Sequence, residues 1–168
     1  YRATAELKSG LNDAAMADCQ TLAESYSMDA ETYYLTGCVA LAMDSYDEAS
    51  SNFTEAYGED ATYDRAIQIY EAYLEKDMEA DGTRYLEAAL SKTADNAQDH
   101  CDRGRVYYYM GDYDNAQKEL QEAADDGNTE AVLLQGMVYM EQKDTASARK
   151  KFEEYVSQAE DSARGFNG

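Results

Sequence analysis

Residues 34–57 read YLTGCVALAMDSYDEASSNFTEAY, and the pattern of this stretch returns twice later in the chain. Residues 101–123 read CDRGRVYYYMGDYDNAQKELQEA, and residues 133–155 read LLQGMVYMEQKDTASARKKFEEY. In each stretch a glycine is followed by an alanine twelve positions later and by a bulky apolar residue sixteen positions later. Self-similarity at a period of about 20–50 residues predicts a repeat architecture.

The spacing of the glycines gives the length of the repeat. Gly37 and Gly104 are 67 positions apart, which divides into 33 and 34 around Tyr70, and Gly104 and Gly136 are 32 apart. A period near 34 residues is the length of one helix–turn–helix unit. We expect the glycines to lie where the two helices of a unit approach most closely. The small residues expected opposite them are Ala49, Ala116 and Ala148, and the core residues one turn later are Phe53, Leu120 and Phe152.

On these residues the chain resembles the tetratricopeptide repeat (TPR) family. The resemblance covers nearly the whole chain and implies an all-α fold, a right-handed α-solenoid of about five helix–turn–helix units in one array. The expected units are residues 1–28, 29–61, 62–95, 96–127 and 128–163, with a tail at 164–168. The first unit is truncated, with a short first helix before Gly10. In the third, Tyr70 stands in the glycine position and the first small residue of the second helix is Gly82, so the close approach can be kept with the small residue on the other helix.

Helix N-termini are predicted at the unit boundaries. The family's usual proline between units is absent here, because the chain contains no proline at all. Side chains that accept hydrogen bonds from the first free N–H groups of a helix mark its start instead. The expected N-caps are Asp29, Thr62, Asp95 and Asn128.

The charge of the chain restricts its partners. Its 168 residues carry a formal net charge of -21, and 44% of them are hydrophobic, as expected of a folded acidic protein. Such a charge repels nucleic acid and anionic membrane surfaces. No apolar run is long enough to insert into a membrane. The composition is similar to that of TPR segments in bacterial surface lipoproteins, so a bacterial cell envelope is slightly favoured over the cytoplasm.

We find no residue set that predicts catalysis, a metal site or a cofactor. The only histidine, His100, occupies a position where the repeat requires a core aromatic, and its neighbour Cys101 points about 100° away on a helix. The three cysteines form no CxxC motif, and we expect free thiols, with a Cys19–Cys38 disulfide as the minor alternative. The prediction is a protein without enzymatic activity.

The resemblance implies a function in protein binding, because the first helices of a TPR array line a concave groove. The residues predicted to line this peptide-binding groove are Tyr34, Leu41, Leu74, Arg105, Tyr108, Tyr109, Met137 and Met140. This set is apolar and the chain is acidic, so we expect a protein or peptide partner that is apolar or basic rather than acidic. Two alternatives stay open: a structural, self-associating subunit that forms a homo-oligomer, and a small-ligand-binding segment of a bacterial surface lipoprotein.

Overall fold

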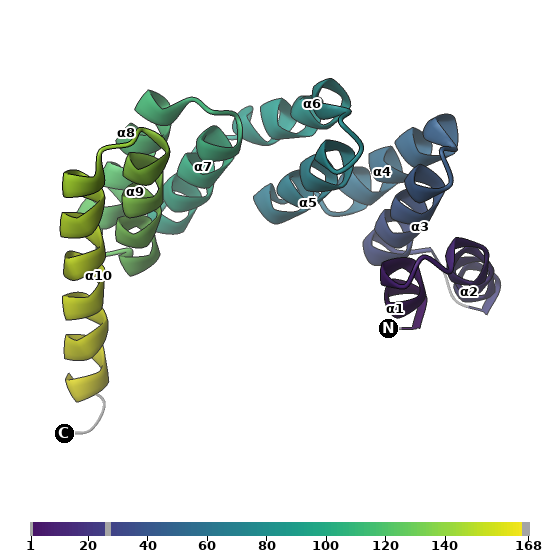
Figure 1. The fold of residues 1–168 in the computed structure, drawn as a ribbon, viewed down its shortest axis with the longest axis horizontal. Coiled ribbons are helices and arrows are strands. Elements are labelled where there is room, and N and C mark those ends of the chain that lie inside the picture. The colour runs from purple at the N-terminus through teal and green to yellow at the C-terminus, as the bar shows by residue number, and fades with distance from the viewer. Residues whose placement is uncertain (1, 26–27, 166–168) are drawn as a thin grey trace. The chain divides into compact units, whose positions relative to one another are not determined.

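The structure is a computed structural model that describes residues 2–25 and 28–165, and this part of the chain contains ten α-helices and no strand (Figure 1). The helices are α1 (Arg2–Lys8), α2 (Asn12–Ser25), α3 (Ala30–Ala42), α4 (Tyr46–Glu59), α5 (Tyr63–Leu74), α6 (Glu79–Leu90), α7 (Ala97–Tyr109), α8 (Tyr113–Asp125), α9 (Thr129–Glu141) and α10 (Thr145–Gly165). The all-α prediction is confirmed.

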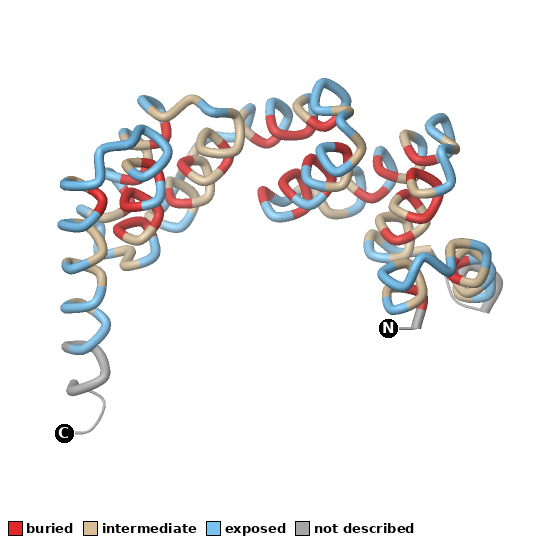
Figure 2. The backbone as a smooth tube through the Cα atoms, viewed as in Figure 1, coloured by how far each residue is buried: buried red, intermediate tan, exposed pale blue. Residues whose placement is uncertain are grey.

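The chain forms two compact units, residues 1–89 and 90–168. In the first unit α1 pairs with α2 and α3 pairs with α4, and α3 also contacts α1, α2 and α5. In the second unit α7 pairs with α8 and α9 pairs with α10, and α9 also packs on α7 and α8. Within each unit, one hairpin therefore covers part of its apolar surface with a helix of the next, which is how repeat proteins build a core. Figure 2 shows the buried residues along the sides of the helices that face their neighbours.

The three repeated glycines lie at close helix contacts, as predicted. A Cβ atom on Gly37 would be 2.7 Å from the ring of Phe53, and one on Gly136 would be 2.4 Å from the ring of Phe152. At Gly104 the nearest atom is a side-chain carbon of Leu120, 2.5 Å away. The bulky residue sixteen positions later thus fills the space above each glycine. The alanines expected there, Ala49, Ala116 and Ala148, are fully buried, and of these only Ala116 contributes one of the nearest atoms, its carbonyl oxygen at 3.3 Å.

The hairpin of α5 and α6 carries its small residue on the second helix. A Cβ atom on Gly82 would lie 2.9 Å from the α-carbon of Tyr70 and 3.2 Å from its carbonyl oxygen. The close approach is kept with the two positions exchanged, as the sequence predicts.

The turn within each hairpin has one recurring geometry. A residue in the left-handed region ends the first helix, and the next N–H group donates to the carbonyl oxygen five residues earlier, which is the Schellman arrangement. Examples are the bonds from Ser45 to Ala40 (2.8 Å) and from Asp144 to Tyr139 (2.9 Å). The left-handed residues of the five hairpins are Gly10, Asp44, Asp77, Gly111 and Lys143, with φ between 58° and 72°.

Three of the four predicted N-caps are confirmed. Asp29 accepts a hydrogen bond from the N–H of Thr32 at 2.7 Å, and Thr62 and Asn128 cap α5 and α9 in the same way. The prediction of Asp95 is wrong, because its neighbour Asn96 caps α7. The Asn96 side chain accepts from two N–H groups, at 2.9 and 3.0 Å, whereas the N–H of Asp95 donates to the Asp99 side chain.

Candidate functional site

A cavity of about 430 Å³ opens in the first unit, and we call it the α3–α5 cavity. Its lining residues are Thr4, Leu7 and Lys8 of α1, Tyr34, Leu35, Cys38, Leu41 and Ala42 of α3, Glu71 and Ala72 of α5, and the following Glu75 and Lys76. On α3 the positions 34, 38 and 41–42 recur every three to four residues, so they share one helix face. The cavity is therefore formed by α1, α3 and α5, which are the first helices of three successive hairpins.

Charged groups surround the apolar lining of the cavity. Glu71 and Glu75 contribute carboxylates, and both residues are exposed. Lys8 and Lys76 contribute amines, but the Lys76 Nζ lies 2.9 Å from the Asp44 carboxylate, which offsets its charge. With Asp44 included, the formal charge around the cavity is negative, in keeping with the acidic chain.

Tyr34 and Cys38 form a half-buried polar pair in the cavity wall. Burial raises the pKa of the Tyr34 hydroxyl, and the neighbouring Cys38 raises it further. Burial also raises the pKa of the Cys38 thiol to about 12, although a hydrogen bond from Tyr34 acts in the opposite direction. Glu75 and Glu31 add to the increase. Both groups are therefore neutral near pH 7, and the wall they form can donate and accept hydrogen bonds without adding charge.

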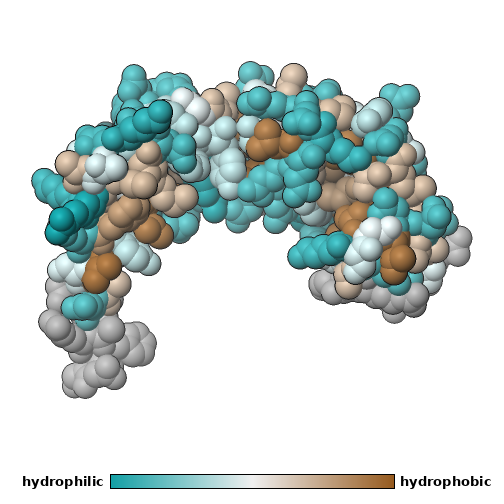
Figure 3. Space-filling model, in the orientation of Figure 1, coloured by the Kyte–Doolittle hydropathy of each residue, from teal (hydrophilic) through white to brown (hydrophobic). Residues whose placement is uncertain are grey.

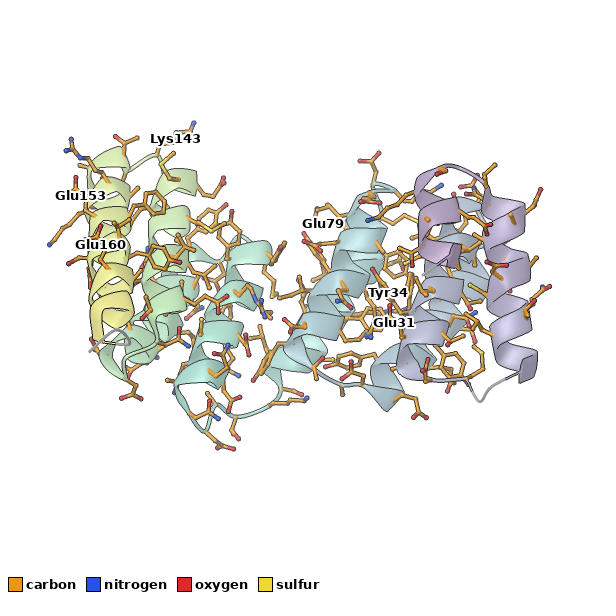
Figure 4. The ribbon with its side chains drawn as sticks, turned by 90° about the horizontal axis from the view of Figure 1, so that it is seen from below. Glu31, Tyr34, Glu79, Lys143, Glu153 and Glu160 are labelled. Carbon is orange, nitrogen blue, oxygen red and sulfur yellow. The ribbon has the colours of Figure 1, made fainter. Side chains whose placement is uncertain are left out.

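Arg65 packs over one face of the Tyr34 ring. The guanidinium carbon lies 4.8 Å from the ring centroid, within the range of a cation–π contact. The same group is 3.0 Å from Glu31 and 3.4 Å from Asp60, and only 7% of Arg65 is exposed. Figure 4 shows Glu31 and Tyr34 on the side of α3 that faces α5. This arrangement ties α3 to α5 and gives the aromatic wall of the cavity a defined orientation.

The predicted groove residues of the first unit have different positions in the structure. Tyr34 is half-buried and lines the cavity. Leu41 lines it as well, but with 2% exposed it belongs mainly to the core. Leu74 is 44% exposed and is not among the lining residues, whereas the adjacent Glu75 is.

In the second unit, the predicted groove residues form smaller groups. Arg105 is paired with Asp102 at 2.9 Å. Tyr108 and Tyr109 are in edge contact, with ring centroids 5.8 Å apart, and the Tyr108 hydroxyl donates to Glu141 at 3.4 Å. The exposed methionines of this unit are Met137 and Met140.

Sequence reasoning missed the part of the cavity that α1 forms. Thr4, Leu7 and Lys8 belong to the truncated first repeat, which lacks the glycine and aromatic positions of the others. One signal was present: Ala3 and Leu7 are four residues apart, which is the spacing of one helix face. Ala3 is 3% exposed and Leu7 packs on the same core cluster.

The structure shows the contacts of His100 and the state of the three cysteines. His100 is half-buried, and its Nδ1 lies 2.7 Å from Glu119, which also pairs with Arg103 at 3.1 Å. The cysteines Cys19, Cys38 and Cys101 are free thiols. Among the residues described, no group of three His, Cys, Asp or Glu side chains could hold a metal ion.

Within residues 2–25 and 28–165, no helix has both the length and the hydrophobicity to cross a membrane.

Comparisons with known proteins agree with this architecture. Residues 101–163 match the family model described as tetratricopeptide repeat, and no curated protein sequence matches the chain. The crystal structure of MamA is similar, with 17% identity over 96% of both chains and a TM-score of 0.53. The C-terminal part of a TPR repeat-containing protein from Cytophaga hutchinsonii has 16% identity over 96% of this chain and 66% of that one, with a TM-score of 0.59. Cut9–Hcn1, an APC/C hetero-tetramer, has 14% identity over 94% of this chain and 31% of that one, with a TM-score of 0.53. At such identities the likeness concerns the fold.

Proposed function

This chain is a tetratricopeptide repeat protein, and on that premise we propose that it is a non-enzymatic scaffold that binds a segment of a partner protein. The α3–α5 cavity takes an apolar or basic side chain of that segment. The observation that carries the proposal is the cavity itself: residues from the first helices of three successive hairpins, both apolar and charged, surround a space of about 430 Å³.

The shape and charge of the cavity favour one kind of occupant. Leu7, Leu35 and Ala72 provide apolar surface that a methylene chain or a branched aliphatic side chain can cover. Glu71 and Glu75 then face the end of that side chain, where an amine or guanidinium gains from their charge. An acidic side chain would instead meet two carboxylates in a chain of net charge -21. Of the structures with this fold, the Cut9–Hcn1 hetero-tetramer is an assembly with another protein.

A second candidate is a small apolar ligand. The volume of the α3–α5 cavity falls within the roughly 300–1,000 Å³ that small-molecule sites occupy in proteins. The neutral Tyr34–Cys38 pair would supply the few polar contacts that such a site needs. A thermal-shift screen of small amphipathic molecules tests this candidate, with an upward shift that Ala72→Phe removes as the supporting result.

Selection from a library of displayed random peptides tests the scaffold proposal. The expected result is enrichment of peptides with Lys or Arg next to an aliphatic residue, and binding that weakens as salt is raised. Ala72→Phe fills the cavity and should reduce the affinity about tenfold or more, since it removes the contact surface of one anchoring side chain. Enrichment of acidic peptides would contradict the proposal.

Charge variants separate the cavity from the general acidity of the chain. Glu75→Lys reverses a charge at the cavity and should weaken binding of the selected basic peptides several-fold. Glu87→Lys makes the same change at an exposed position of α6 outside the lining residues, and should leave binding nearly unchanged. Equal effects of the two variants would show that net charge, rather than the cavity, determines affinity. Circular dichroism melts confirm that each variant is folded.

A further inference from the structure

α10 exposes apolar side chains that its own unit leaves uncovered. Val156 is 52% exposed and Met140 of α9 is 49% exposed. They share a shallow hollow of about 460 Å³, whose lining is almost entirely apolar in exposed surface, with Thr145, Arg149, Phe152 and Glu153. Among the described side chains of α10 only Ala148 is buried, near the N-terminal end, and the rest are intermediate or exposed (Figure 2). Figure 3 shows hydrophobic surface over α9 and α10 on this face. Patches of this kind mark interaction sites.

The charges of α10 are separated along its length. Residues 145–151 contain three basic residues and no acidic one, and residues 152–161 contain four acidic residues and no basic one. Glu153 and Glu160, both labelled in Figure 4, are exposed in the acidic half. In the basic half Arg149 and Lys150 are exposed.

One face of the helix repeats this order in a self-complementary way. Arg149, Phe152, Val156 and Glu160 are spaced by three, four and four residues, which places them in one row along the helix. We name these four residues the α10 row. The row begins with the basic Arg149, continues with the apolar Phe152 and Val156, and ends with the acidic Glu160. A second row running in the opposite direction therefore places opposite charges against each other at both ends.

We propose that the α10 row is a docking surface for α10 of a second copy of this chain, in antiparallel orientation about a two-fold axis. In this orientation Arg149 meets Glu160 of the second copy. The exposed part of the Phe152 ring, whose other side covers Gly136, meets Val156 of the second copy. Because a two-fold interface uses the same patch on both copies, each contact occurs twice. A parallel pair would place Arg149 against Arg149 and Glu160 against Glu160, which like-charge repulsion opposes.

The net charge of the chain restricts where two copies can meet. Two molecules of charge -21 repel each other over most of their surfaces. The basic residues 145–151 are a local exception that attracts the acidic half of another α10. The row is small, so the dimer is a weak one of the transient class, and its stability falls with added salt.

Sedimentation velocity at chain concentrations from about 5 µM to about 1 mM covers the dissociation constants of weak interfaces. The wild-type chain should show reversible monomer–dimer exchange in this range. Arg149→Glu and Glu160→Arg should each weaken dimerisation about five- to tenfold, and the double variant should recover to within about threefold of wild type, as expected for a coupled pair. Lys150→Glu makes the same charge change outside the row and should have little effect.

Other results would overturn the proposal. These are a monomer at every concentration, a double variant no better than either single variant, or an equal loss in Lys150→Glu. Arg149 also pairs with Glu153 in its own helix at 2.7 Å, so helix content is measured for each variant. Val156→Asp places a charge at the centre of the row without touching that ion pair and should abolish the dimer. A dimer that persists in this variant belongs to another surface.

Discussion

A Cβ atom on Gly82 would lie 2.9 Å from the α-carbon of Tyr70, a distance that packed atoms in folded proteins essentially never have. The other hairpin glycines differ in one respect. At Gly37, Gly104 and Gly136 the nearest atoms belong to side chains, which can rotate, whereas at Gly82 the nearest atom belongs to the backbone of α5.

Gly82→Ala should therefore destabilise the first unit. The added methyl group forces α5 and α6 apart, and overpacking of this kind costs about 1–3 kcal/mol in free energy of unfolding. Chemical denaturation measures the change. Gly58→Ala is the matched control, because Gly58 is in α4 with nothing within 4 Å of the added atom. It should stabilise the chain by up to about 1 kcal/mol through helix propensity. A stabilised Gly82→Ala would show that the contact is looser than described.

Asn96→Ala should destabilise the second unit by about 1 kcal/mol. The substitution removes the acceptor for two N–H groups at the start of α7, and N-cap substitutions cost roughly this amount. Asp95→Ala changes the residue next to it without removing those bonds and should stay within about 0.5 kcal/mol of wild type. Urea unfolding of the two variants measures their free energies of unfolding and shows which residue caps α7. The reverse order of effects would restore Asp95 as the cap.

Lys143→Gly should stabilise the second unit by up to about 1 kcal/mol. Lys143 has a φ of 62°, and a side chain in this region costs about 1–2 kcal/mol that glycine avoids. The greater freedom of glycine in the unfolded chain cancels part of this gain. Gln142→Gly, one residue earlier and with a φ of -72°, has no strain to relieve and should destabilise instead. Thermal melts of both variants provide the comparison.

The Cys38 thiol should make stability depend on pH above pH 9. Its pKa in the folded chain is about 12, above the ordinary value of 9.0, because burial disfavours the thiolate. The contribution of the protonated thiol to the free energy of unfolding is complete below pH 9, and it is lost as the pH rises from 9 through about 12. Cys38→Ala removes the contribution, so its free energy of unfolding should fall less steeply between pH 9 and 11 than that of wild type. Ser51→Ala, at an exposed position of α4, should keep the wild-type slope.

Much of the fold could be predicted from the sequence because close helix packing restricts residue size at a few positions. Gly37, Gly104 and Gly136 each leave room for one bulky side chain, and that requirement repeats in the sequence. The exchange at Tyr70 and Gly82 was predictable for the same reason. The cap of α7 was not, because Asp95 and Asn96 can both accept the required hydrogen bonds and only the path of the backbone selects between them.

The candidate site was predictable only where the repeat is regular. Tyr34, Cys38 and Leu41 follow the helix period along α3, so their common face could be inferred. The contribution of α1 could not, because the first repeat lacks the residues that set the register of the others. Leu74 lies outside the cavity lining, whereas Glu75 and Lys76 belong to it. The helix period alone does not predict which residues at the end of α5 face the cavity.

The contact between Gly82 and Tyr70 has a consequence for how this chain can change over generations. An alanine at Gly37 could be tolerated if Phe53 became smaller in the same lineage, because all three nearest atoms belong to the Phe53 side chain, so these two positions are free to covary. No trimmed neighbour can make room at Gly82, because every residue at position 70 has an α-carbon. Position 82 should therefore stay glycine in descendants of this sequence, while Gly37 and Gly136 can change together with Phe53 and Phe152.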